Sequence, residues 1–223
     1  IWNDYIDKDF DRKVKRTKGR LITSNIVNKT EIIAYSIINL LIGAIPLYFI
    51  PIKSIFISFC VIPLIIVYPF MKRITWWPQL WLGLCYNWGI LVSYSIYNEH
   101  LFTIELFLFY GGSVLFTIGY DTIYGYQDLK DDQIIGIKST SLKFRNKPKL
   151  FLFNIYIFAF ALWITSLFFL DKSNFTILLV AVSCLLMTVK VLRTNINITI
   201  DCLKTFNYNS YFSLTIMIIL IAS

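Results

Sequence analysis

The chain has 223 residues, of which 57% are hydrophobic, and its mean hydropathy of +0.65 lies well above that of an ordinary soluble domain. Its net charge of +8 would suit a nucleic-acid-binding protein, but the basic residues fall in short segments between apolar runs. Composition therefore argues against a nucleic-acid partner and predicts an integral membrane protein whose cations face lipid headgroups.

The N-terminal segment is polar and rich in charge. Its basic residues are Lys8, Arg12, Lys13, Lys15, Arg16, Lys18, Arg20 and Lys29. It also contains Asn3, Asp4, Asp7 and Asp11, which are spaced by three or four residues and can share one face of a helix. Asp9 lies on another side of such a helix, and we expect it to be solvated.

Seven apolar runs follow. They cover residues 32–52, 54–71, 74–98, 101–120, 150–170, 173–189 and 205–223. Most have the 17 to 25 residues that a helix needs to cross a hydrocarbon core of about 30 Å, and only helices satisfy their own backbone there. The sequence therefore predicts an all-α polytopic membrane protein.

The distribution of charge predicts its topology. If residues 1–30 lie in the cytoplasm, alternate crossings leave only Lys53 and Lys172 of the 21 basic residues on the opposite side. This asymmetry is typical of the positive-inside rule. It places the two long polar segments, residues 1–30 and 121–149, on the same cytoplasmic side, where we expect the functional site.

The second polar segment is also acidic. It carries Asp121, Asp128, Asp131 and Asp132 directly after an apolar run. If residues 121–132 form one helix, the first, second and fourth of these carboxylates lie on one face, because steps of seven and four residues are nearly whole turns. Two acidic faces on one side of a membrane require cations between them.

We expect any metal site in this chain to use oxygen ligands. The single histidine, His100, excludes a multi-histidine site, and Cys60, Cys85, Cys184 and Cys202 lack the close pairing of a zinc or redox motif. Carboxylate and amide oxygens favour magnesium, with manganese as the other choice.

The two acidic segments resemble the paired aspartate motifs of the UbiA superfamily of intramembrane prenyltransferases. Residues 3–11 match Asn-Asp-x-x-Asp-x-x-x-Asp, and Tyr120-Asp121-Thr122 with Asp128-x-x-x-Asp132 is similar to the second motif. Similarity to the 4-hydroxybenzoate polyprenyltransferase branch is carried by Arg16-Thr17, Arg20, Tyr68 to Arg73, Thr75, Pro78-Gln79, Asn87-Trp88-Gly89 and Ile137 to Thr140. Leu21 and Gly125 depart from the family, which commonly has proline and alanine there.

The resemblance implies a fold of nine transmembrane helices around a central cavity, with the motifs after helices 2 and 6. The seven runs then correspond to helices 3 to 9. Since the chain begins with Ile1 instead of Met, we expect it to be N-terminally incomplete, with helices 1 and 2 missing. Residues 1–223 would form a single membrane-embedded domain.

The resemblance also implies the reaction. A polyprenyl group passes from its diphosphate to the ring of 4-hydroxybenzoate in ubiquinone biosynthesis, with Mg²⁺ as cofactor. The expected partners are polyprenyl diphosphate, 4-hydroxybenzoate and the lipid bilayer, with no protein partner evident. The expected location is the bacterial inner membrane, or the mitochondrial inner membrane if the source is eukaryotic, with the active site toward the cytoplasm.

Each part of this chemistry has candidate residues. We expect catalysis to involve Asp7, Asp128 and Arg73. The expected substrate-binding residues are Asn3, Arg16, Arg20, Lys72, Arg73, Asn87, Tyr120 and Lys138. The expected metal ligands are Asn3, Asp4, Asp7, Asp11, Asp121, Asp128 and Asp132.

Several alternatives remain open. The aspartates could be solvated helix ends. Lys72 and Arg73 could grip a benzoate carboxylate or anchor the helix at the membrane surface. Asn87 could line a substrate pocket or form an interhelical hydrogen bond. The acceptor could be a naphthoate, a haem vinyl group or a glycerol phosphate lipid, and a cation-coupled transporter would also place acids near a membrane.

Overall fold

The computed structural model describes residues 1–14 and 16–223, and helices are the only regular elements in that part of the chain. Lys15, one of the cations counted in the N-terminal segment, lies outside the described residues. The elements are α1 (Trp2–Ile6), α2 (Lys8–Asp11), α3 (Lys29–Ala44), η1 (Ile45–Phe49), α4 (Ile52–Phe59), α5 (Ile62–Ile74), α6 (Pro78–Tyr86), α7 (Trp88–Tyr97), α8 (Ile104–Gly125), α9 (Leu129–Ile135), α10 (Thr140–Lys143), α11 (Pro148–Phe169), α12 (Asn174–Arg193) and α13 (Thr199–Ile221).

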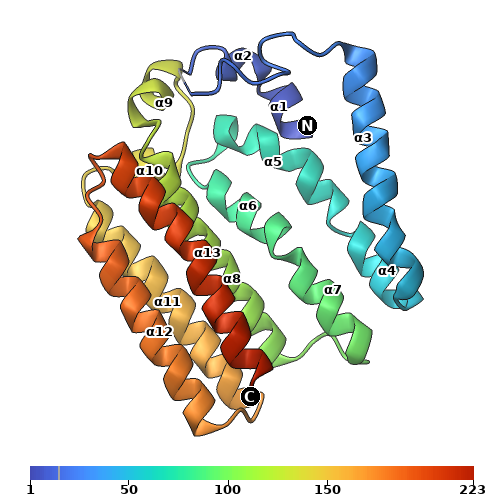
Figure 1. Cartoon of the computed structure of the whole chain (residues 1–223), viewed down its shortest axis with the longest axis vertical. Helices are drawn as coiled ribbons and strands as arrows, with labels where there is room; N and C mark the ends of the chain where they lie inside the picture. Colours follow the sequence, from blue (N-terminus) through green and yellow to red (C-terminus); the bar gives the residue numbers. More distant parts are fainter. Residues whose placement is uncertain (15) are drawn as a thin grey trace.

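The long helices run roughly side by side, and the short helices α1, α2, α9 and α10 gather at one end of them (Figure 1). Five segments of the described chain are long and apolar enough to cross a membrane. These are Lys29–Phe49, Ile52–Ile74, Ile104–Gly125, Pro148–Phe169 and Asn174–Arg193. The prediction of an all-helical polytopic membrane protein is confirmed.

Two of the expected runs differ in detail. The run over residues 74–98 is divided into α6 and α7, because Asn87 turns its side-chain amide onto backbone carbonyls and Gly89 follows, and both residue types weaken a helix. The last run forms α13, which begins earlier than expected, at Thr199. Polar residues such as Asn207 and Asn209 keep it out of the set of strongly apolar spans.

Local signals fix where helices begin and end. Asn28 accepts a hydrogen bond from the backbone of Glu31, whose carboxylate accepts one from the Asn28 N–H, so a capping box starts α3. Pro148 occupies the first turn of α11, where its missing N–H costs nothing. Gly136, with φ of 78°, ends α9 in the left-handed conformation.

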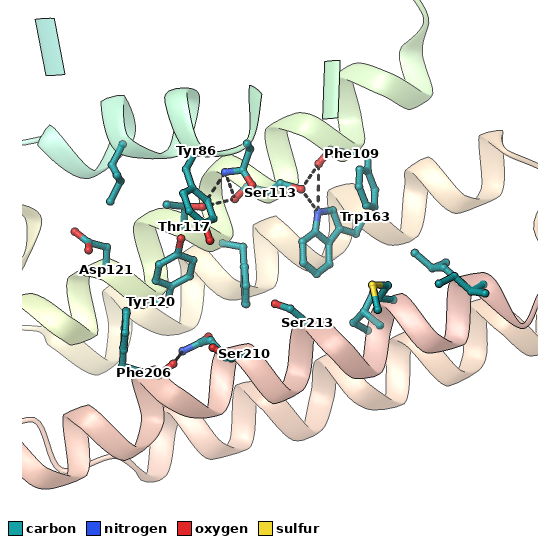
Figure 2. A pocket seen from close by; sticks show the side chains of 18 residues that line it. Tyr86, Phe109, Ser113, Thr117, Tyr120, Asp121, Trp163, Phe206, Ser210 and Ser213 are labelled. Atoms are coloured by element: carbon teal, nitrogen blue, oxygen red, sulfur yellow. Dashed lines mark hydrogen bonds between the residues drawn. The ribbon is translucent and has the colours of Figure 1, made fainter. Parts of the chain in front are cut away.

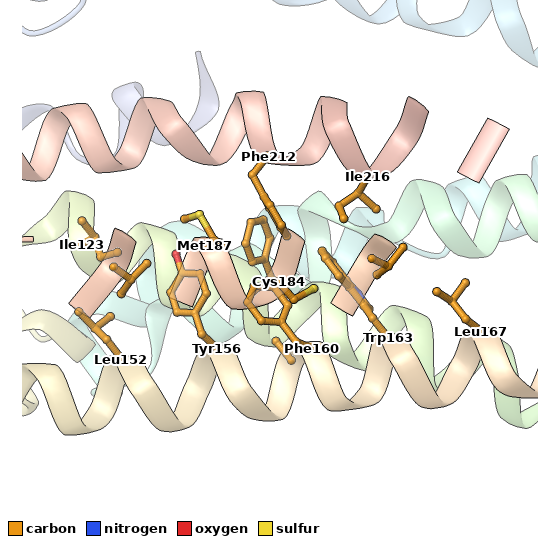
Figure 3. Close-up of a cluster of buried hydrophobic side chains, with 14 of the residues drawn as sticks. Ile123, Leu152, Tyr156, Phe160, Trp163, Leu167, Cys184, Met187, Phe212 and Ile216 are labelled. Atoms are coloured by element: carbon orange, nitrogen blue, oxygen red, sulfur yellow. The ribbon is translucent and has the colours of Figure 1, made fainter. Parts of the chain in front are cut away.

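The core lies between α8, α11, α12 and α13. Aromatic side chains dominate it, and Figure 3 shows Tyr156, Phe160 and Trp163 of α11 with Phe212 of α13. Phe116 of α8 contacts all four of these rings. Helices α8 and α11 approach closely because a glycine, Gly112, faces Trp163. By contrast, α3 buries none of its residues. The most deeply buried part of the molecule is therefore the side that carries the second acidic segment.

Candidate functional site

The first acidic segment is an interrupted helix. Helices α1 and α2 meet at Asp7, whose N–H donates to the Asn3 carbonyl at 2.9 Å and whose carbonyl accepts from the Asp11 N–H at 2.8 Å. The helical spacing thus persists through the break. Asn3 and Asp7 consequently point into one small pocket.

The other two acids of this segment have a different partner. Arg20 donates through Nη1 to Asp4 Oδ1 at 2.8 Å and to Asp11 Oδ2 at 3.2 Å. None of these three residues is among the described side chains that line the small pocket. Arg20 therefore neutralises the two acids of this segment that lie outside the pocket lining. A contact between Arg20 and diphosphate stays a prediction.

The second acidic segment is not the continuous helix that the spacing suggested. Helix α8 ends at Gly125 and α9 begins at Leu129, with a turn between them. Gly125 weakens the helix, and a side chain there would meet Ser141, so the departure from alanine at this position has a steric reason. Asp121, Asp128 and Asp132 nevertheless line the same small pocket as Asn3 and Asp7.

That pocket has a volume of about 200 Å³ and unites segments from both halves of the described chain. It is lined by Asn3, Asp7, Arg16, Tyr68, Pro69, Lys72, Pro78, Gln79, Asp121, Tyr124, Gly125, Asp128, Asp132, Ile137, Lys138 and Ser139. The tertiary structure therefore brings together four of the predicted acids and three of the predicted cations. Tyr68, Gln79, Tyr124 and Ser139 were not among the predicted site residues, although Tyr68 and Gln79 lie in the segments that carry the family resemblance.

Cations of the chain itself are paired with these carboxylates. Lys72 Nζ lies 2.7 Å from Asp7 Oδ2. Arg16 donates through Nη2 to Asp128 Oδ2 at 2.6 Å and through Nε to Asp128 Oδ1 at 3.2 Å, while its Nη1 donates to the Tyr124 hydroxyl at 2.9 Å. Such a two-nitrogen contact is the strong form of an arginine–carboxylate pair.

Lys138 and Arg73 are placed differently. Lys138 Nζ donates to the Ile74 carbonyl at 2.9 Å, and Lys138 lines the pocket. Arg73 lies outside the described lining: its Nη2 donates to the Ile6 carbonyl at 2.9 Å, and its guanidinium lies 4.9 Å from the centre of the Phe10 ring. Arg73 thus ties α5 to the first acidic segment, and its catalytic role stays a prediction.

Burial raises the pKa of two of the acids. Desolvation raises the pKa of Asp7, and the hydrogen bond and charge of Lys72 oppose that rise. For Asp132, burial followed by the nearby negative charge of Asp128 raises the pKa to about 7. In both cases loss of solvent is the main cause, and it outweighs the nearby cations that favour the charged form.

The residues fit a divalent cation. Asp7 Oδ1 is buried and accepts no hydrogen bond from a described residue, although the Arg73 guanidinium is 3.7 Å away. The described residues form no cluster of three side chains able to hold a metal by themselves. Mg²⁺ needs fewer, since it typically uses one or two carboxylates together with substrate phosphate oxygens.

A larger cavity of about 830 Å³ extends toward the opposite end of the helices (Figure 2). Asp121 lines both this cavity and the small pocket. Its lining includes Tyr120 and Asn87, as predicted, together with mainly apolar and aromatic side chains of α8, α11 and α13. Asp121 lies away from Trp163 along this cavity. The arrangement is a charged pocket leading into an apolar chamber.

Asn87 forms an interhelical hydrogen bond and also lines the cavity, and its contact with substrate stays a prediction. Its Nδ2 donates to the Gly83 carbonyl at 2.8 Å, to Thr117 Oγ1 at 2.8 Å and to the Ser113 carbonyl at 3.2 Å, so it links α6 to α8 while lining the cavity. The sequence interpretation missed the contribution of α13, where Asn209, Ser210 and Ser213 line the cavity. Polar residues one and four positions apart in an apolar run were the available signal.

Comparison with known proteins identifies the family. Residues 1–213 match the family described as "UbiA prenyltransferase family". The chain belongs to the UbiA prenyltransferase family. A solved relative, the "Apo structure of a UbiA homolog from Aeropyrum pernix K1", superposes with a TM-score of 0.78 over 99% of this chain and 82% of that one, at 21% identity, which shows the common fold.

Curated relatives carry related names. The chain is 39% identical over 150 residues to "4-hydroxybenzoate geranyltransferase 2" of Lithospermum erythrorhizon, covering 67% of this chain and 49% of the relative. It is 35% identical to "4-hydroxybenzoate octaprenyltransferase" of Francisella tularensis subsp. mediasiatica (strain FSC147), covering 98% of this chain and 77% of the relative. The chain spans about half the length of several other curated relatives. The predicted family is confirmed, and the absence of two helices stays a prediction.

Proposed function

We propose that this UbiA-family chain transfers a polyprenyl group from polyprenyl diphosphate to the ring of 4-hydroxybenzoate, releasing diphosphate. The observation that carries the proposal is the meeting of both acidic segments in one pocket, which shares its lining residue Asp121 with a mainly apolar cavity. The names of relatives at 35–39% identity support the choice of acceptor. The product of this reaction belongs to ubiquinone biosynthesis.

The charged pocket suits the diphosphate. Lys72, Lys138 and Arg16 line it and supply positive charge to phosphate oxygens, with Arg16 able to form two parallel hydrogen bonds. Asp7 and Asp128, one from each acidic segment, both line the pocket and are the carboxylates that we propose as the principal metal ligands. The other predicted metal ligands that line the pocket are Asn3, Asp121 and Asp132. Asp4 and Asp11 lie outside its lining and are paired with Arg20.

Mg²⁺, when bound, supplies a Lewis acid that neutralises charge on the departing diphosphate. The chain's own residues do the rest of the positioning. Since Lys72 and Arg16 pair with Asp7 and Asp128, these cations must turn from carboxylate to phosphate oxygens when substrate enters. We therefore assign Lys72 and Arg16 to diphosphate binding.

The apolar cavity suits the tail. Its walls include the apolar side chains of Phe109, Phe116 and Met217. Trp163 also lines it, and the Trp163 indole N–H already donates to Ser113 Oγ at 3.0 Å. The reactive end of the tail would then lie beside Asp121, where the two spaces join. The aromatic ring attacks that allylic carbon ortho to its phenol oxygen, and loss of the ring proton restores aromaticity.

The membrane orientation follows from the positive charges. We propose that the end carrying α1, α2, α9 and α10 faces the cytoplasm of a bacterial inner membrane, or the matrix side of a mitochondrial inner membrane. Relatives with mitochondrial and bacterial names support both settings.

Membranes containing the protein, radiolabelled 4-hydroxybenzoate and a polyprenyl diphosphate test the proposal. Label should enter the lipid extract with Mg²⁺ and not with a chelator. A panel containing a naphthoate, haem and a glycerol phosphate lipid distinguishes other acceptors. Cation uptake by sealed vesicles without any prenylated product would reject the enzyme in favour of a transporter.

A further inference from the structure

The segment before α11 and the loop after α12 lie at the same end of the bundle as α9 and α10 (Figure 1). A second polar cavity forms there, apart from the candidate active site. It has a volume of about 950 Å³ and forms where the segment that leads into α11 meets the loop between α12 and α13. Its lining residues are Arg145, Asn146, Lys147, Pro148, Lys149, Leu150, Arg193, Thr194, Asn195, Ile196 and Asn197. It shares none of them with the small acidic pocket.

Positive charge dominates this cavity. Arg145, Lys147, Lys149 and Arg193 line it, and no acidic side chain does so among the described residues. Within the described chain, Lys147, Lys149 and Arg193 form no ion pair, and Arg145 donates to the neutral amide oxygen of Gln133 at 3.0 Å. The four basic side chains are exposed, so solvent screens their mutual repulsion, but their combined positive charge still attracts an anion. Asp201 lies beside the lining, where its carboxylate accepts a hydrogen bond from the Asn195 N–H at 2.6 Å.

The backbone adds donors at the same place. Helix α11 starts at Pro148, and Lys147 provides no side-chain cap. The N–H groups of Lys149 and Leu150 donate to no described residue, which leaves them at the positive end of a 22-residue helix. Backbone donors in the first turn of a long helix suit the oxygens of a phosphate.

The cavity also lies at a membrane surface. Arg193 ends one apolar span and Pro148 begins another, so the cations sit at headgroup depth. Leu150 lines the cavity and is exposed, and farther along these helices Phe153 and Val189 are exposed as well. A ligand with a phosphate in the cavity would therefore have room for hydrocarbon on the outer surfaces of α11 and α12.

We propose that this basic cavity binds a phosphate group, supplied by an acidic phospholipid whose acyl chains lie along α11 and α12. Basic pockets at the cytoplasmic ends of transmembrane helices are suited to anionic headgroups. The site is independent of the proposed prenyl transfer, because the two pockets have separate linings and charges of opposite sign predominate in them.

Lipid binding to the purified full chain tests this directly. Native mass spectrometry in detergent would follow titrations of phosphatidylglycerol, phosphatidylcholine and inorganic phosphate. The double variant Lys147→Gln/Arg193→Gln removes two cations from the cavity. The matched control Lys18→Gln/Lys130→Gln removes two exposed cations that do not line it.

We expect phosphatidylglycerol to bind more tightly than phosphatidylcholine, and the cavity variant to weaken it by roughly thirtyfold, the change expected when two cations near an anionic lipid are lost. The control should keep the affinity of the parent protein. If phosphatidylglycerol binds no more tightly than inorganic phosphate, the cavity is a site for soluble phosphate and the proposed lipid ligand is rejected. Equal losses in both variants, or no preference for the anionic lipid and no phosphate binding, would overturn the proposal.

Discussion

Arg16 and Asp128, which are separated by 112 positions in the chain, are joined by hydrogen bonds from two guanidinium nitrogens, Nη2 to Oδ2 at 2.6 Å and Nε to Oδ1 at 3.2 Å. This pair links the N-terminal polar segment to the second acidic segment. On the other side of the pocket, Lys72 contacts Asp7 in the same manner. The chain thus provides its own cations where the proposed reaction would provide metal.

Replacing Asp7 with Asn should lower kcat/KM by roughly a hundredfold or more, the order lost when one charged contact to a reacting group is removed. Asp128→Asn should behave similarly. The matched control is Asp9→Asn, because the Asp9 side chain is 89% exposed and lies in the same segment. Turnover of labelled 4-hydroxybenzoate, normalised to inserted protein, measures the effect. Near-normal turnover in both pocket variants would contradict the proposed metal and diphosphate clamp.

Arg16→Gln should separate two kinds of binding. Without the guanidinium, Asp128 is free of its competitor, so Mn²⁺ used as a probe should bind the substrate-free protein more tightly. The KM for polyprenyl diphosphate should rise several-fold, since a charge-assisted contact to phosphate is lost. Electron paramagnetic resonance of Mn²⁺ and steady-state kinetics measure the two effects. If the variant bound both Mn²⁺ and polyprenyl diphosphate more tightly, or both more weakly, Arg16 would not exchange Asp128 for phosphate oxygens as proposed.

Stability of the metal-free protein should fall as the pH rises from about 4 to about 7. The pKa of Asp132 is raised to about 7 by burial and by Asp128, and Asp131 adds to this while Lys72 and Arg16 oppose it. An unfolded aspartate has a pKa near 3.9. The folded state therefore holds the proton more tightly, and its advantage is complete below the unfolded pKa and lost as the pH passes the folded one.

Thermal unfolding in detergent with a chelator measures this pH dependence. Asp132→Asn should remove most of the slope between these pH values. Mn²⁺ should also bind the parent protein more tightly as the pH rises through 7, because the proton no longer competes with the metal. A slope that survives in the Asn variant would assign the effect to another group.

Gly112→Ala should destabilise the fold by about 1–3 kcal/mol, the usual cost of overpacking. A Cβ there would lie 2.5 Å from Trp163 Cδ1 and 2.8 Å from the Ala159 carbonyl oxygen, so α8 and α11 would have to separate. The adjacent Gly111→Ala is the control, because its nearest neighbour would be Leu162 Cδ1 at 3.7 Å. Denaturant titration in mixed micelles should show a lower free energy of unfolding for Gly112→Ala and no change for Gly111→Ala.

Asn87→Ala should lower the free energy of unfolding by about 1 kcal/mol, the order measured for interhelical hydrogen bonds in membranes. Its amide holds Thr117 and Ser113 of α8 against α6. Asn39→Ala is the control, since the Asn39 amide donates to Tyr35 within its own helix. Equal stability of the two variants would show that the link between α6 and α8 does not depend on this side chain.

The sequence by itself determined the class of the protein, its family and the identity of most charged groups in the pocket. Apolar runs of bilayer length must form helices, because only helices satisfy their own backbone in lipid. Polar residues spaced by three or four positions then share one face of a helix. This local rule placed Asn3 and Asp7 together correctly. Residues 121–132 do not form one continuous helix, because α8 ends at Gly125 and α9 begins at Leu129, yet Asp121, Asp128 and Asp132 still line one pocket.

Only the tertiary structure decided which charges meet. The pairing of Arg16 with Asp128 and of Lys72 with Asp7, the position of Arg73 outside the pocket, and the joining of both cavities at Asp121 depend on how helices pack. No local spacing encodes these contacts, because they join residues far apart in the chain through packing between helices. The basic cavity also depends on tertiary packing, since its cations come from the start of α11 with the segment before it and from the end of α12, which meet only when α11 and α12 pack together.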